Sequence, residues 1–122
     1  KYNFLIAGGK KEARDFKKIK KKLPRNNLTN LCHLTIEKCL YLLEGSRFYI
    51  GNDTGFMHIC GSLGIKSFGI FGDTPSDYCN YNHKIIPILP KGYKETKQGD
   101  AALNKIFVED ILNNSHFKKC HL

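Results

Sequence analysis

The sequence predicts an α/β fold in which a parallel sheet carries helices on both faces. Short apolar segments of strand length alternate along the chain with longer segments whose apolar residues recur at helical spacing. Polar turns that contain glycine follow several of the apolar segments, and such turns are where α/β sheets place their ligand crevice. We therefore expect the order β-α-β-α-β-α-β-β-α.

The first half of the chain is expected to hold two strands and two helices. Residues 2–7 form an apolar run of strand length that ends in two glycines. Residues 11–23 place their apolar side chains on one helical face and their lysines on the other. Residues 30–32 predict a weak short strand. Thr35 is a good N-cap for the next amphipathic helix, which ends near Gly45.

The middle of the chain predicts the core of the sheet. Apolar strands are expected at 47–50 and 67–71, on either side of a helix of small residues at 55–63. A further strand is expected at 84–89, and its Pro87 indicates the edge of the sheet or a bulge, because proline donates no ladder hydrogen bond.

Length and cysteine content bound the domain organisation. The 122 residues are enough for one domain with its own core, so we expect a single domain over 1–122, with a last helix at 108–114 and a loose tail at 116–122. The chain starts with lysine, and we expect it to be a piece of a larger protein. The five cysteines contain no CxxC pair, which predicts reduced thiols in a cytoplasmic protein rather than disulfides or a zinc site.

The positive charge is concentrated at the start of the chain. Residues 1–25 contain ten of the 20 Lys and Arg and two of the 11 acidic residues, which leaves them with +8 of the total net charge of +9. No aromatic residue shares the lysine face of this helix, as stacking on bases would require, so a solvated face is favoured and no nucleic-acid partner is expected from it. Contact with nucleic acid or with anionic lipid headgroups stays open as the alternative.

Four residues with suitable chemistry come together after the central strand. A helix that begins at Gly55 has free N–H groups and a partial positive charge at its start, so it can hold a phosphate or diphosphate together with the Thr54 hydroxyl. Asp53 repels phosphate and fits better as an acceptor for sugar hydroxyls. His58 lies one turn into the helix and can face the same crevice. The alternative is that Asp53 and Thr54 form a simple N-cap and that the histidine is structural.

A second polar turn follows the next strand. Gly72-Asp73-Thr74-Pro75 would form the neighbouring wall of the crevice, with an ordinary β-turn as the alternative. The Gly8-Gly9 turn lacks the GxGxxG fingerprint of dinucleotide-binding proteins. Walker A, HExxH and GxSxG motifs are also absent from the sequence, which argues against the enzyme classes that they mark.

The segment YIGNDTGFMHICGSLGIKSFGIFGDTPSD resembles the signature of glycosyltransferase family 9, the ADP-heptose:lipopolysaccharide heptosyltransferases. That signature is D-[ST]-G-x-x-H, a small-residue helix, a hydrophobic strand and [FY]-G-x-T-x-P. The proline here follows the threonine directly, whereas the family more often places it two residues later. The residues that match are Asp53, Thr54, Gly55 and His58 in the first block, and Phe71, Gly72 and Thr74 in the second.

The resemblance implies a fold and a donor. The family fold is GT-B, two Rossmann-like domains with the active site between them. This chain resembles the C-terminal, nucleotide-sugar-binding domain over residues 2–77. The implied donor is a nucleotide sugar, ADP-heptose above all, with no metal and no other cofactor.

The resemblance also implies roles for individual residues. Thr54 and Gly55 would hold the diphosphate, and Asp53 and His58 would contact the sugar and its phosphate neighbourhood. Glu12 is the candidate for the acidic residue that contacts the ribose, with Lys11 as the neighbouring alternative. Gly72 and Thr74 would complete the donor site from the second turn, and residues near Leu34-Thr35 would lie by the base.

The acceptor side is expected to lie elsewhere. The resemblance implies a lipid-linked or glycan acceptor, bound by an N-terminal domain outside this chain, in the synthesis of lipopolysaccharide core or a related glycan. No general base is identified, so we expect this chain to bind donor weakly and to transfer nothing alone. The resemblance to the family also implies peripheral contact of the protein with the inner membrane. Two other interpretations remain: a non-catalytic nucleotide-binding module of flavodoxin-like topology, and a nucleic-acid binder driven by the N-terminal charge.

Overall fold

The structure is a computed structural model that describes residues 2–23 and 27–121, the side chain of residue 121 excepted. The chain, predicted to be a single domain, divides into two compact units, Lys1–Gly45 and Ser46–Leu122, and each is described by itself. Among the described residues, no helix has both the length and the apolar character needed to cross a membrane.

The first unit contains a short parallel β-ladder and two α-helices. Its two strands pair in parallel, with Phe4 opposite Leu28 and Ile6 opposite Asn30. The helix between them turns its lysines to solvent and keeps Phe16 and Ile19 half-buried, as its amphipathic pattern predicts. The elements are β1 (Phe4–Ile6), the 3₁₀ turn η1 (Lys10–Glu12), α1 (Ala13–Lys22), β2 (Leu28–Asn30) and α2 (Ile36–Leu43).

The second strand lies earlier in the sequence than predicted. The pattern predicts a strand at 30–32, but β2 ends at Asn30. The side-chain oxygen of Asn30 accepts a hydrogen bond from the backbone N–H of Cys32 at 2.9 Å, which turns the chain away from the ladder. Leu31 and Cys32 follow this turn and are buried in the core of the unit. Their apolar side chains therefore reflect burial and not membership in the strand.

The second unit is built on a three-stranded parallel sheet. The sheet order is β3-β4-β5, with β4 in the centre. Its proline, Pro87, lies on β5 at the edge, as predicted. The elements are β3 (Phe48–Asn52), α3 (Gly55–Ser62), β4 (Lys66–Ile70), η2 (Ser76–Cys79), β5 (Ile85–Ile88), η3 (Leu103–Lys105), α4 (Val108–Leu112) and α5 (Ser115–His121).

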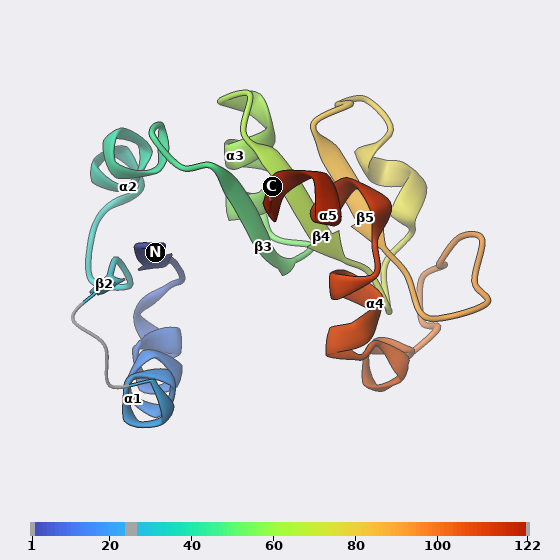
Figure 1. Ribbon diagram of the computed structural model, residues 1–122, viewed down its shortest axis with the longest axis horizontal. Coiled ribbons are helices and arrows are strands. Elements are labelled where there is room, and N and C mark those ends of the chain that lie inside the picture. The colour runs from blue at the N-terminus through green and yellow to red at the C-terminus, as the bar shows by residue number, and fades with distance from the viewer. Residues whose placement is uncertain (1, 24–26, 122) are drawn as a thin grey trace. The chain divides into compact units, whose positions relative to one another are not determined.

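Alternating side chains of the sheet build a separate core on each face. Met57 of α3 packs on one face with Phe71, Cys79 and Ile85. Figure 1 shows α3 and α5 on opposite sides of the sheet. Phe68, Ile88, Phe117 and Cys120 form the core beneath α5. A parallel sheet covered by helices on both faces is the predicted fold class, which the second unit confirms.

The predicted loose tail at 116–122 is wrong as far as residue 121. Residues Ser115–His121 form α5, and Phe117 is only 4% exposed. Its ring meets the rings of Phe48 and Phe68 edge-on, at centroid distances of 5.5 and 5.3 Å. These aromatic contacts stabilise a short helix that the residue pattern of this segment does not predict. Residue 122 lies outside the described residues.

All five cysteines are free and buried, which confirms the prediction of thiols without disulfides. Burial raises the pKa of the Cys60 thiol to about 11. A thiol of such a pKa carries little reactive thiolate at neutral pH, so Cys60 behaves as a small apolar core residue.

We expect Gly72→Ala to destabilise the second unit by about 1–3 kcal/mol. The added Cβ would lie 2.5 Å from the backbone nitrogen and 2.7 Å from the Cα of Leu103, and a backbone segment moves away less easily than a side-chain tip. Urea unfolding followed by circular dichroism measures the loss. Gly45→Ala is the matched control, since nothing lies within 4 Å of a Cβ there. Equal midpoints for the two variants would contradict this account.

Candidate functional site

The two predicted polar turns meet at the carboxyl ends of β3 and β4. These strands are parallel neighbours, so the residues that follow them leave the sheet at one edge. The Thr74 hydroxyl donates a hydrogen bond of 2.8 Å to Oδ2 of Asp53, 21 residues earlier in the chain. Two turns that the sequence predicts separately are therefore joined by one side-chain contact.

The second carboxylate oxygen of Asp53 faces the first turn of α3. Oδ1 lies 3.3 Å from Nε2 of His58. The Asp53 side chain is 18% exposed and that of His58 is 37% exposed, so this pair sits at the rim of the site and is reached by solvent. Both oxygens of Asp53 thus have protein partners, one on each of two neighbouring elements.

Tyr81 is a member of this cluster that the sequence analysis missed. Its hydroxyl lies 2.5 Å from Nδ1 of His58, and its ring stacks on the imidazole at a centroid distance of 5.9 Å and an interplanar angle of 23°. Tyr81 lies 23 residues after His58, beyond the 3₁₀ turn η2. No spacing rule connects a helix residue with a loop residue at such a distance, so the sequence carried no signal for it.

The start of α3 is open to a ligand. Thr54 precedes the helix in an extended conformation and makes no side-chain capping bond, and Asp53 is engaged elsewhere. The backbone N–H groups of Gly55 and Phe56 have no acceptor within the described part of the chain. A Cβ built on Gly55 meets nothing within 4 Å. Thr54 thus holds the N-cap position of α3, but neither its side chain nor that of Asp53 makes a capping hydrogen bond in the structure.

A half-buried phenol lies beside the Thr54 hydroxyl. The hydroxyl oxygen of Tyr49 is 3.5 Å from Oγ1 of Thr54. Burial raises the pKa of the Tyr49 phenol, so the group stays a neutral hydroxyl across the physiological range. The Tyr49 ring covers the space above Gly51, where a Cβ would meet the ring carbon Cζ at 2.6 Å.

The second turn is held from outside by a later loop. The Thr96 hydroxyl donates to the backbone oxygen of Thr74 at 2.8 Å, and the Ala101 N–H donates to Oδ1 of Asp73 at 3.2 Å. The carbonyl of Gly72 accepts from the Ala102 N–H at 2.6 Å. Gly72 is buried under this crossing, so the structure gives it a packing reason to be glycine.

Glu12 belongs to the first unit, whereas the cluster above is built from the second unit alone. Its carboxylate lies over the Gly8-Gly9 turn that follows β1. A Cβ on Gly9 would lie 2.9 Å from Oε2 of Glu12, and a Cβ on Gly8 would lie 2.9 Å from its Cβ. Gly8 leaves room for the Cβ of Glu12, whereas at Gly9 only the flexible carboxylate end would have to move.

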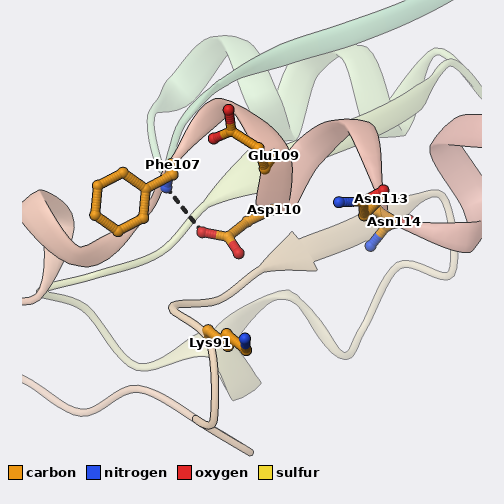
Figure 2. A pocket seen from close by; sticks show the side chains of 6 residues that line it. All are labelled: Lys91, Phe107, Glu109, Asp110, Asn113 and Asn114. Carbon is orange, nitrogen blue, oxygen red and sulfur yellow. Dashed lines mark hydrogen bonds between the residues drawn. The ribbon is translucent and has the colours of Figure 1, made fainter.

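A separate hollow of about 460 Å³ lies at the other helical layer of the second unit. Figure 2 shows the side chains around it, with the Asp110 carboxylate accepting from the N–H of Phe107. Asn114 is likewise occupied, because its side-chain oxygen accepts from the N–H groups of His116 and Phe117. These polar groups cap α4 and α5 and are not free for a ligand. The lining residues are Lys91, Phe107, Glu109, Asp110, Asn113 and Asn114.

We expect Thr74→Val to destabilise the second unit by about 1–2 kcal/mol, because it leaves a charged, mostly buried carboxylate oxygen of Asp53 without its donor. Thr74→Ser, which keeps the hydroxyl, should lose less than half as much. Chemical denaturation compares the three proteins. If valine and serine cost the same, the contact between the two turns contributes nothing.

Comparison with known proteins agrees with this geometry. The chain matches glycosyltransferase family 9 (heptosyltransferase) over residues 2–105. No curated protein and no solved structure gives a significant match. The matched region contains both strand-end turns and the open start of α3. The chain therefore belongs to glycosyltransferase family 9.

Proposed function

We propose that this chain binds the donor of a glycosyl transfer, a nucleotide sugar, with its diphosphate at the start of α3. The observation that carries the proposal is the open helix start, where two backbone N–H groups have no acceptor among the described residues and Gly55 leaves room for a close approach. A helix of this kind presents N–H donors and a partial positive charge to an anion. Membership in a glycosyltransferase family supports a diphosphate as that anion.

The proposed division of roles follows the geometry. Thr54 and Gly55 hold the diphosphate, because the Thr54 hydroxyl is not consumed by capping. Asp53 accepts hydrogen bonds from hydroxyls of the sugar beside it, and His58 contacts the sugar with its ring, at a rim that solvent reaches. Thr74 contributes through Asp53, and Gly72 through the packing of its turn. The role of Glu12 as a ribose contact stays a prediction from the sequence, because this residue belongs to the first unit. No metal takes part in this proposal.

The finer identity of the donor is part of the same proposal. The matched family is described as heptosyltransferase, which supports ADP-heptose and a role in lipopolysaccharide core or related glycan synthesis. The share of the reaction that we propose for this chain is donor binding, not proton abstraction from the acceptor. Asp53 accepts from Thr74 and lies 3.3 Å from Nε2 of His58, so we assign it the role of a fixed acceptor for sugar hydroxyls and not that of a base.

Calorimetric titration with ADP, UDP, GDP and ADP-heptose tests this proposal. We expect the adenine ligands to bind more tightly than UDP or GDP. Gly55→Ala should weaken ADP roughly ten- to a hundredfold, because its Cβ displaces the anion from hydrogen bonds to charged oxygens. The fold should be unaffected, because the new Cβ has free space in the ligand-free protein.

Two variants control for unspecific effects. Gly45→Ala adds the same methyl group at another open position and should leave ADP affinity unchanged. Thr54→Val removes one hydroxyl and should weaken ADP less than Gly55→Ala does. Absence of adenine-nucleotide binding, or equal affinities for Gly55→Ala and Gly45→Ala, would refute the donor site.

We also propose a membrane-facing role for α1. Its cationic side chains are exposed, and one of them, Lys18, is paired with Asp15 at 2.7 Å. The apolar residues Phe16 and Ile19 point away from this face and are half-buried. A surface of compact, hydrated ammonium groups without interleaved aromatic rings suits anionic headgroups better than stacked bases. The exposed cations are Arg14, Lys17, Lys18, Lys20, Lys21 and Lys22.

Vesicle co-sedimentation measures this contact. Replacing Lys17, Lys20 and Lys21 by Gln should lower binding to phosphatidylglycerol vesicles on the order of a hundredfold, with little binding of either protein to phosphatidylcholine. The matched control carries the same charge change in the second unit, at three exposed lysines whose side chains make no hydrogen bond or ion pair among the described residues: Lys91, Lys94 and Lys118. If the control loses as much binding as the α1 variant, net charge and not this helix is responsible.

A further inference from the structure

We propose that Tyr81 is a positioning residue for His58, and that it fixes the imidazole so that the Asp53–His58 pair meets the sugar of the donor in one geometry. This inference rests on the proposed donor site and assigns Tyr81, which lies outside the family signature, a role in it. The observation behind it is that one tyrosine makes two different contacts with one ring: a hydrogen bond of 2.5 Å and a parallel stack at 23°.

The two ring nitrogens of His58 have different partners, and this assigns the tautomer. Nε2 lies 3.3 Å from a carboxylate oxygen of Asp53, which only accepts, so Nε2 carries the hydrogen. In the neutral imidazole Nδ1 then accepts, and the nearby Tyr81 hydroxyl donates to it. In this tautomer the Tyr81 hydroxyl donates to Nδ1 of His58, the Nε2–H faces Asp53 at ion-pair distance, and Thr74 donates to Asp53 from the other side.

Packing alone does not account for this contact. Tyr81 is 66% exposed and does not belong to either core cluster of the second unit. A tyrosine that served only the core would bury its ring, whereas Tyr81 places one ring face on an imidazole at the rim of the site.

The consequence for the donor is a fixed carboxylate. With both nitrogens of His58 engaged, the imidazole cannot turn about its Cβ–Cγ bond without breaking two contacts. The Asp53 carboxylate then lies between the Thr74 hydroxyl and an imidazole whose orientation is fixed. The lone pairs that these contacts leave free therefore point toward the donor in one fixed orientation. Loss of the Tyr81 hydroxyl should therefore affect the sugar end of the donor more than the diphosphate end.

Two measurements on the intact chain test this inference, with Tyr81→Phe as the variant. The first is the ¹⁵N NMR spectrum of the His58 ring in ligand-free protein. We expect the Nδ1 signal to move toward that of an imidazole nitrogen without a hydrogen bond, while Nε2 stays protonated. The second is calorimetry, in which affinity for ADP-heptose should fall about two- to tenfold and affinity for ADP should stay constant.

Tyr78→Phe is the matched control, because Tyr78 is a neighbouring tyrosine of similar exposure, 64%. It should change neither measurement. An unchanged Nδ1 signal in Tyr81→Phe overturns the positioning role. A shifted signal with unchanged ADP-heptose affinity also overturns it, since the ring is then held without consequence for the donor.

The outcome for the donor site is read separately. If wild-type protein binds no nucleotide, the proposed function fails, and the functional half of this inference fails with it. The NMR arm still reports whether Tyr81 holds His58 in the ligand-free protein. A loss of ADP affinity in Tyr81→Phe as large as the loss of ADP-heptose affinity would point to a general structural effect and overturn the assignment to the sugar end.

Discussion

The hydrogen bond from Thr74 to Asp53 is the contact on which the rest of the site depends. It joins the chain after β3 to the chain after β4, two neighbours of a parallel sheet whose ends leave at one edge. The loop at 96–102 holds the second turn in place through hydrogen bonds from the Thr96 hydroxyl and from the N–H groups of Ala101 and Ala102, and α3 presents His58 to the first turn. The carboxylate of Asp53, at the end of β3, is thereby contacted by Thr74 after β4 and by His58 of α3.

This arrangement separates two tasks that the sequence places side by side. Asp53 and Thr54 are adjacent, and either could cap α3, yet neither does so. Asp53 turns toward Thr74 and His58, which leaves the helix start without an internal acceptor. The same choice that organises the carboxylate therefore keeps the N–H groups of Gly55 and Phe56 available for an anion. Anion binding and hydroxyl recognition lie next to each other without competing for one side chain.

Most of the second unit follows from local pattern. The strand at Phe48–Asn52, the helix at Gly55–Ser62 and the edge position of Pro87 agree with periodicity and with the lack of a proline N–H. The misses have particular causes. The Asn30 side chain ends β2 earlier than the apolar run does, and α5 forms because Phe117 packs on Phe48 and Phe68 from distant strands. The spacing of residues in the sequence does not reveal whether a side chain forms such a turn hydrogen bond or joins such an aromatic cluster.

The sequence by itself determined the fold class, the order of elements in the second unit as far as α4, and the residues of the two strand-end turns, because helix and strand periods and turn chemistry are local properties. It also carried the family signature. Only the tertiary structure decided that Asp53 contacts Thr74 rather than capping α3, that Gly72 is glycine because another backbone crosses it, and that Tyr81 reaches His58. Each of these is a contact between segments 20 or more residues apart, which spacing cannot encode and packing alone establishes.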